Sequence, residues 1–157
     1  MTNKNGKVVI KKVKLRFIDS CWFMPSSLDK LAGDFDDEEC RKLRYFYRGD
    51  DYFKLMTQKG VYTYEYMDGW QKFEETKLPP KEAFYSKLNK RGISDGDYER
   101  AIEVWKTMTE KTLGEYHDTF LKTDVLLLSD VFETFRKTCL EHYQLDTAHF
   151  YTAPGLA

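Results

Sequence analysis

The stretch TFLKTDVLLLSDVF, Thr119 to Phe132, has the pattern of a helix that carries an acidic residue inside its apolar face. The i, i+4, i+7 rule places Phe120, Asp124 and Leu127 on one side of such a helix, with Leu128 beside them. Burying an unpaired carboxylate is costly, so Asp124 needs a cation, a set of hydrogen-bond donors or a metal ion. The hydrophobic stripe continues on both sides of this stretch at helical spacing, through Leu113, Tyr116, Leu127, Val131, Phe135 and Leu140.

Two interpretations of Asp124 are open from the residues alone. In the first, the stripe bends around the side chain, which reaches solvent or pairs with Lys122 or Arg136. In the second, Asp124 is a metal-binding carboxylate held on a rigid helix. A single Asp does not distinguish between them.

Helix boundaries are marked by capping patterns. Thr112 and Glu115 form the S/T-x-x-E pattern of a capping box, and no Gly or Pro follows until after His149, which predicts a long helix. Upstream, Ile93 and Tyr98 occupy the positions of a hydrophobic staple around a second helix start. Two shorter helices are predicted, one from Pro25 through residue 31 and one in KEAFYSKL, residues 81–88.

Strand-like patterns lie in the N-terminal half. In VVIKKVKLRFIDS, residues 8–20, Val13, Leu15 and Phe17 alternate with other residues, which predicts a strand. KGVYTYEYM, residues 59–67, has strand-like residues and is predicted to be either extended or a loop. One or two strands cannot form a sheet alone, and the C-terminal YTAPGLA ends abruptly. These features predict a fragment, or a module that is completed by a partner.

Composition indicates a globular chain of about one domain. The sequence has 157 residues, 41% of them hydrophobic and 32% charged, with a net charge of -1 that does not indicate nucleic acid binding. Residues 1–18 nevertheless hold six cations and no acid, and DFDDEE follows at 34–39. The odd, widely spaced Cys21, Cys40 and Cys139 predict reduced thiols in an intracellular protein. No signal peptide and no membrane-spanning run is predicted.

Five blocks in order resemble the family B DNA polymerases of the organellar and viral, protein-primed type, which linear mitochondrial plasmids and self-synthesising transposons also encode. The blocks are LRFIDSCWFMPSSLDKLAGDF, QKGVYTYEYMDGW, LPPKEAFYSKL, KTLGEYHDTFLKTDVLLLSDVFE and HFYTAPGLA. The resemblance implies an α/β fold, an incomplete ribonuclease-H-like exonuclease domain with few strands followed by three or more helices. Residues 1–143 would be the C-terminal part of the 3′–5′ exonuclease-like domain, and 144–157 the start of the polymerase domain.

The resemblance also assigns catalytic roles. FLKTD, Phe120 to Asp124, matches the family's Tyr-x-x-x-Asp exonuclease motif, so Asp124 would be a catalytic carboxylate that holds metal. Phe120 takes the position of the Tyr, whose hydroxyl can orient the attacking water, and Phe cannot do this. Lys59 in QKGVYTY would be the catalytic-site lysine that neutralises charge on the scissile phosphate. The alternative for Lys59 is a surface lysine beside a turn.

The DNA-binding residues implied by the resemblance are Ser20, Met24 and Tyr64. Ser20 and Met24 match the ends of the family's Ser-Leu-x-x-hydrophobic motif, with Cys21 in place of the Leu. A second match in SSLDKL fits the pattern better but its spacing less well. For both matches the alternative is a helix N-cap, because Ser often precedes an apolar run for that reason.

Other motifs of the family do not occur in this sequence. These are the exonuclease motifs Asp-x-Glu and Asn-x-x-x-Phe-Asp and the polymerase motif Tyr-x-Asp-Thr-Asp. Asp124 alone cannot hold two metal ions. We therefore expect a fragment of a DNA-directed DNA polymerase that is inactive by itself. Its parent would use Mg²⁺, a DNA template-primer, deoxynucleotides and a terminal protein primer, in the nucleus or a mitochondrion. The alternatives are a decayed transposon remnant kept as a DNA-binding or protein-interaction module, and a soluble helical domain whose resemblance is structural only.

Overall fold

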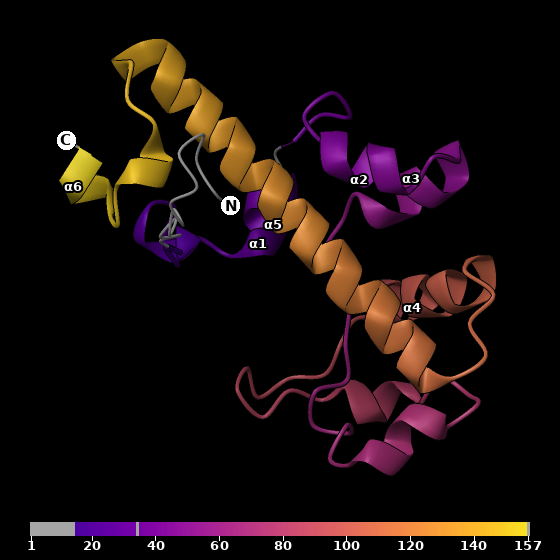
Figure 1. Cartoon of the computed structure of the whole chain (residues 1–157). Coiled ribbons are helices and arrows are strands. Elements are labelled where there is room, and N and C mark those ends of the chain that lie inside the picture. The colour runs from indigo at the N-terminus through magenta and orange to yellow at the C-terminus, as the bar shows by residue number, and fades with distance from the viewer. Residues whose placement is uncertain (1–14, 34, 157) are drawn as a thin grey trace, which may run out of the picture.

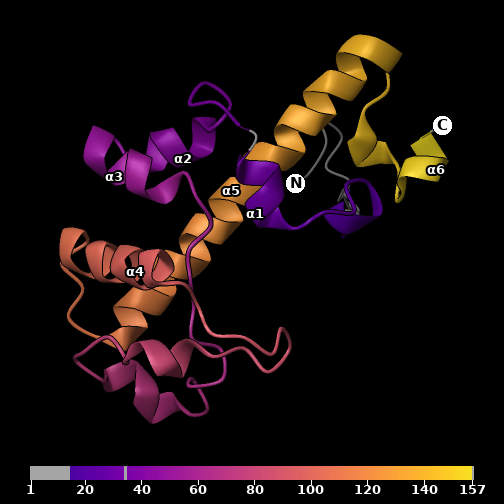
Figure 2. The ribbon, with the colours of Figure 1, turned by 180° about the vertical axis from the view of Figure 1, so that it is seen from behind.

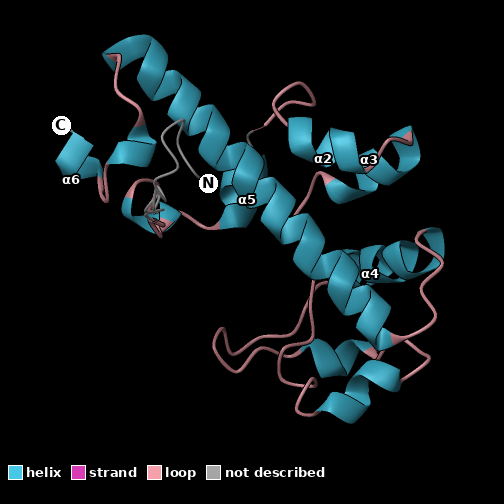
Figure 3. Ribbon diagram, viewed as in Figure 1, coloured by secondary structure: helices cyan, strands magenta, loops and turns pink. Residues whose placement is uncertain are grey.

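The structure is a computed structural model that describes residues 15–33 and 35–156. Helices joined by turns and extended segments make up these residues, and none of them belongs to a strand (Figure 3). The α-helices are α1 (Leu28–Gly33), α2 (Arg41–Phe46), α3 (Asp50–Met56), α4 (Asp95–Thr107), α5 (Leu113–Tyr143) and α6 (Ala153–Leu156). The 3₁₀ helices are η1 (Ser20–Trp22), η2 (Trp70–Glu74), η3 (Lys81–Phe84) and η4 (Thr147–His149).

The predicted α/β fold, an incomplete ribonuclease-H-like exonuclease domain, is therefore wrong. Of the strand predicted over residues 8–20, residues 8–14 lie outside the described part, and Leu15 to Asp19 form no ladder. Leu15 and Phe17 are 75% and 87% exposed, so their alternation buries no face. Residues 59–67, predicted to be extended or a loop, form an irregular segment with a turn at 64–66. A strand pattern yields a strand only where a neighbour supplies backbone partners and an apolar layer, and here helices cover the core instead.

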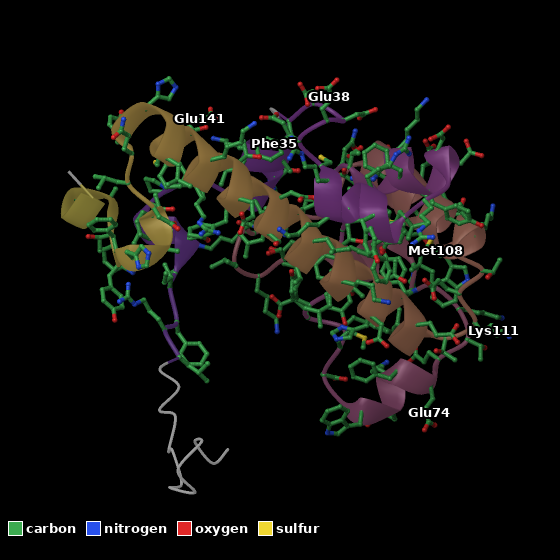
Figure 4. All side chains as sticks on the ribbon, turned by 45° about the horizontal axis from the view of Figure 1, so that its top comes forward. Phe35, Glu38, Glu74, Met108, Lys111 and Glu141 are labelled. Carbon is green, nitrogen blue, oxygen red and sulfur yellow. The ribbon has the colours of Figure 1, made fainter. Side chains whose placement is uncertain are left out.

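Helix α5 is the axis of the molecule. It runs diagonally across Figure 1, and Figure 2 shows the same arrangement from behind. Helices α1 and α2 pack against its middle, η2 against its N-terminal part and η4 against its C-terminal part. Side chains from these elements fill the space along α5 (Figure 4).

The long helix begins where the capping pattern predicts. The Thr112 hydroxyl accepts from the Glu115 N–H at 3.2 Å, while the Glu115 carboxylate accepts from the Lys111 N–H at 2.6 Å. The helix ends at Tyr143 and is capped by Gln144, whose φ of 58° is the left-handed conformation common at helix C-termini. At α4, Ser94 and Asp97 form both hydrogen bonds of a capping box, so this predicted helix start is confirmed too. The predicted helix over residues 81–88 is only the short η3.

The core lies where α2, α3, η3 and α4 meet the N-terminal half of α5. Its most deeply buried side chains include Leu43, Phe53, Leu113 and Leu127, each at most 1% exposed. Asp130 of α5 is also buried, at 3% exposure, and its side chain caps the N-terminus of α2. Its carboxylate accepts from the backbone N–H of Lys42 at 2.9 Å and of Leu43 at 3.0 Å. No local pattern predicts this cap, because Lys42 and Leu43 are 88 and 87 residues from Asp130.

Several other expectations concern the chain as a whole. No helix in the described part is long and apolar enough to cross a membrane. Cys21, Cys40 and Cys139 are free, as predicted, with Cys21 exposed and the other two buried. The division between an exonuclease-like part and a polymerase part after residue 143 stays a prediction, although α5 ends at Tyr143.

Candidate functional site

Asp124 lies on α5 one turn beyond Phe120, beside the extended segment that follows α3. Its Oδ2 atom is 3.7 Å from the Nζ atom of Lys59, and its Oδ1 atom is buried without a hydrogen-bond partner in the described chain. Burial raises the pKa of the Asp124 carboxyl, and the positive charge of Lys59 opposes this shift. The carboxylate is therefore only half satisfied.

The partners that the sequence offered to Asp124 are engaged elsewhere. The Lys122 ammonium lies over the Phe46 ring, 5.0 Å from its centroid. Arg136 donates to Asp146 and Glu133. The residue that does pair with Asp124 is Lys59, which the sequence resemblance had selected separately, from a different block.

An aromatic cluster surrounds Phe120 on the same face. The Tyr62 ring stacks on Phe120 with centroids 4.6 Å apart, and the Tyr64 ring meets it edge-on at 6.0 Å. The Lys59 ammonium lies 5.8 Å from the Phe120 centroid. A Cβ atom on Gly60 would come within 2.9 Å of the Phe120 ring, so the absence of a side chain there lets the segment approach α5. Lys59, Tyr64, Phe120 and Asp124 thus form one site.

Three side chains that the sequence did not assign to the site hold this segment in place. Arg100 of α4 donates to the backbone carbonyls of Gln58 and Lys59, the latter at 2.9 Å. On α5, the Tyr116 hydroxyl donates to the Val61 carbonyl at 2.7 Å. These bonds fix the backbone on either side of Gly60, so the Lys59 side chain starts from an ordered position.

His117 completes the support through a side-chain contact. Its Nδ1 atom is 2.6 Å from the hydroxyl oxygen of Tyr62. Burial, and to a lesser degree the neighbouring Tyr64, raises the pKa of Tyr62 to about 12. The Tyr62 hydroxyl is therefore protonated. The Tyr62 ring lies between the rings of Phe120 and His117. The apolar stripe included Tyr116 but not its hydrogen bond, and Arg100 and His117, which are half-buried, have no distinctive spacing in the sequence.

The predicted DNA-binding residues Ser20 and Met24 do not join this site. They flank Phe23, whose ring contacts Phe132 at 6.2 Å and Phe135 at 6.0 Å between centroids. Phe132 is eight residues beyond Asp124, about 12 Å along the helix at 1.5 Å per residue. Ser20 is also not the cap of its helix, since Asp19 accepts from the Cys21 N–H at 3.0 Å.

The other SSLDKL match has a structural explanation. The Ser27 hydroxyl accepts from the Lys30 N–H at 3.4 Å, at the start of α1. This contact is typical of an N-cap, which was the alternative to a role in DNA binding.

The site fits one metal ligand and not a complete metal centre. The free Oδ1 atom of Asp124 is a suitable oxygen ligand for Mg²⁺. Within residues 15–33 and 35–156, however, no three His, Cys, Asp or Glu side chains are grouped so that they could hold a metal ion. A pair of metal ions would need further carboxylates from outside the described residues.

The geometry therefore combines a cation, an exposed aromatic ring and a half-satisfied carboxylate on one face of α5. The Tyr64 ring is 63% exposed, and the Lys59 side chain is 30% exposed. Such a face can bind a phosphate and stack a base. Comparisons with protein-family models, with curated proteins and with solved structures find no match for this chain.

Proposed function

We propose that this chain is a segment of a DNA-directed DNA polymerase of the protein-primed family B type, and that its site holds single-stranded DNA for 3′–5′ exonuclease proofreading. The observation that supports this most directly is the contact between Lys59 and Asp124, 3.7 Å apart. The resemblance selected these two residues from separate blocks as members of one catalytic site. Their contact is what that assignment requires.

Each side chain has a defined part in this proposal. Lys59 attracts the phosphate of the strand, and Tyr64 stacks a base on its exposed ring. Asp124 is one ligand for Mg²⁺, which when bound would supply Lewis-acid activation of the phosphate. The parent enzyme acts on a DNA template-primer and deoxynucleotides, with a terminal protein as primer, in the nucleus or a mitochondrion. The polymerase motifs are not in this sequence, so this chain contributes binding and no nucleotide transfer.

DNA binding tests the proposal directly. We expect a fluorescently labelled oligothymidine to bind the whole chain at low salt, with affinity that falls as salt rises. Tyr64→Ala should weaken binding about tenfold, because stacking contributes about 1–3 kcal/mol per base. Tyr143→Ala is the matched control, since Tyr143 is 67% exposed and lies at the far end of α5. Fluorescence anisotropy that shows no binding, or equal losses in both variants, would contradict the proposal.

A second candidate function is a DNA-binding module without catalysis. Two observations favour it: Phe120 lacks the hydroxyl of the motif's Tyr, and Asp124 already has a cation partner in Lys59. Manganese distinguishes the two candidates, because Mn²⁺ broadens the NMR signals of nearby nuclei. Broadening of the Phe120 and Lys59 signals that disappears in Asp124→Asn supports the exonuclease segment. DNA binding without any such broadening supports the module.

A further inference from the structure

A short hairpin, residues 85–92, stands beside the candidate site. It is closed by an isolated bridge in which the Ser86 N–H donates to the Arg91 carbonyl at 2.9 Å. The Ser86 hydroxyl accepts from the Asn89 N–H at 3.1 Å, and Lys90 has a φ of 52°. These contacts give the turn a defined shape. Figures 1 and 2 show it as a loop that projects from the helices, with Leu88 89% exposed.

The hairpin carries positive charge that is only partly neutralised. It holds Lys87, Lys90 and Arg91, and no Asp or Glu occurs from residue 83 to residue 94. Only Lys87 has an acidic partner, Glu65, at 3.4 Å. In the described chain, Lys90 and Arg91 form no ion pair, whereas Lys72, Lys81 and Lys137 each do. Other lysines, such as Lys106 and Lys111, also lack an ion pair there, but the hairpin differs in having no acidic residue in its own stretch of chain.

Two hydrogen bonds attach the hairpin and the preceding η3 to the segment that carries Tyr64. The Thr63 hydroxyl donates to the Ala83 carbonyl at 2.5 Å, and the Glu65 carboxylate accepts from the Lys87 N–H at 3.0 Å. Tyr64 lies between these two anchors. The hairpin begins with a second exposed ring, Tyr85, which is 47% exposed. Two exposed aromatic rings, Tyr64 and Tyr85, therefore lie on the connected segments that carry Lys59 and the cations of the hairpin.

We infer that the hairpin extends the binding surface for single-stranded DNA, with Lys90 and Arg91 contacting the phosphates of nucleotides beyond the one at Tyr64. This inference rests on the proposed function, because that function places the strand at Lys59 and Tyr64. An acidic peptide would also be attracted by the cations. The exposed Tyr64 and Tyr85 rings favour DNA, since bases stack on such rings and acidic side chains do not.

The test uses the whole chain with the charges of the hairpin removed. In Lys90→Asn with Arg91→Gln, Asn tolerates the left-handed conformation at position 90, so the turn is retained. The matched control is Lys106→Gln with Lys111→Gln, which removes two exposed cations near the α4–α5 connection. Figure 4 labels Lys111 there, and Figures 1 and 2 place that connection and the hairpin on opposite sides of α5.

The measurement is the salt dependence of binding to a labelled oligothymidine of about ten nucleotides. Each phosphate contact to a single strand contributes about 0.7 to the slope of log affinity against log salt. Without its two phosphate contacts, the hairpin variant should have a slope smaller by about 1.4. Between about 50 and 200 mM salt, the DNA affinity of the wild type should therefore fall about sevenfold more than that of the variant. The control variant should keep the wild-type slope.

The outcomes separate the inference from the proposed function. If Tyr64→Ala weakens binding but the hairpin variant keeps the wild-type slope, the hairpin inference is wrong and the site stands. If the hairpin and control variants lose equal slope, the binding is non-specific attraction and the inference is also wrong. If polyglutamate competes as well as unlabelled oligothymidine at equal charge, the partner is an acidic peptide and the inference of DNA binding is wrong. If no oligonucleotide binds at all, the proposed function itself fails.

Discussion

Removing one charge of the Lys59–Asp124 pair at a time should give unequal losses of stability. The Asp124 side chain is 20% exposed and fixed on α5, and its Oδ1 atom has no hydrogen-bond partner among the described residues. The Lys59 side chain is 30% exposed and has a flexible stem. Without Asp124, the ammonium can turn to water. Without Lys59, the carboxylate stays buried and unpaired.

The separation of the two charges sets the scale of the effect. At 3.7 Å the Coulomb attraction is about 4.5 kcal/mol with an effective dielectric constant of about 20, and about 1 kcal/mol in bulk water. The desolvation of both groups offsets much of this. We expect Lys59→Met to lower the free energy of unfolding by about 3 kcal/mol, because it strands a buried charge. Asp124→Asn should change it by at most about 1 kcal/mol.

Urea unfolding followed by circular dichroism measures both values. The pKa of Asp124 is raised in the fold by burial, so the folded state binds its proton more tightly than the unfolded state does. The loss in Lys59→Met should therefore shrink as pH falls through the folded-state pKa of Asp124. The Lys137–Glu141 pair is the control, because its charges are also 3.7 Å apart but about 60% exposed. Equal losses for Lys59→Met and Asp124→Asn, without metal, would refute the reasoning.

Two further predictions concern the structural contacts of α5. Asp130→Ala should lower the free energy of unfolding by about 2–3 kcal/mol in urea melts, because it leaves two N–H groups at the start of α2 without their acceptor. The control is Asp118→Ala, which changes an exposed residue of the same helix and should have no measurable effect. The Arg136 guanidinium lowers the pKa of Asp146 to about 2, so this carboxylate stabilises the fold above its unfolded pKa near 4 and loses that contribution as pH falls toward about 2. Unfolding titrations across this range should give a shallower pH dependence for Arg136→Gln than for the wild type, and identical profiles would contradict the assignment.

Local patterns in the sequence determined the helices and the position of Asp124 on one of them. Each of these patterns involves residues only a few positions apart, so it forms independently of the tertiary structure. They are the Thr112 cap, the Ser94 capping box and the apolar stripe of α5. The same periodicity placed Asp124 next to Phe120 on one helical face. A carboxylate in that stripe, in need of a partner, could therefore be recognised from the sequence alone.

Only the tertiary structure decided which partners these residues have. The pairing of Lys59 with Asp124, the hold of Arg100 on the backbone of Lys59 and the capping of α2 by Asp130 join segments far apart in the chain. Such contacts depend on how α5 packs, which no local spacing encodes. The absence of a sheet in the described residues has the same origin. Alternating residues such as Leu15 and Phe17 predict a strand, but a strand needs a neighbour, and the helices around α5 supply none.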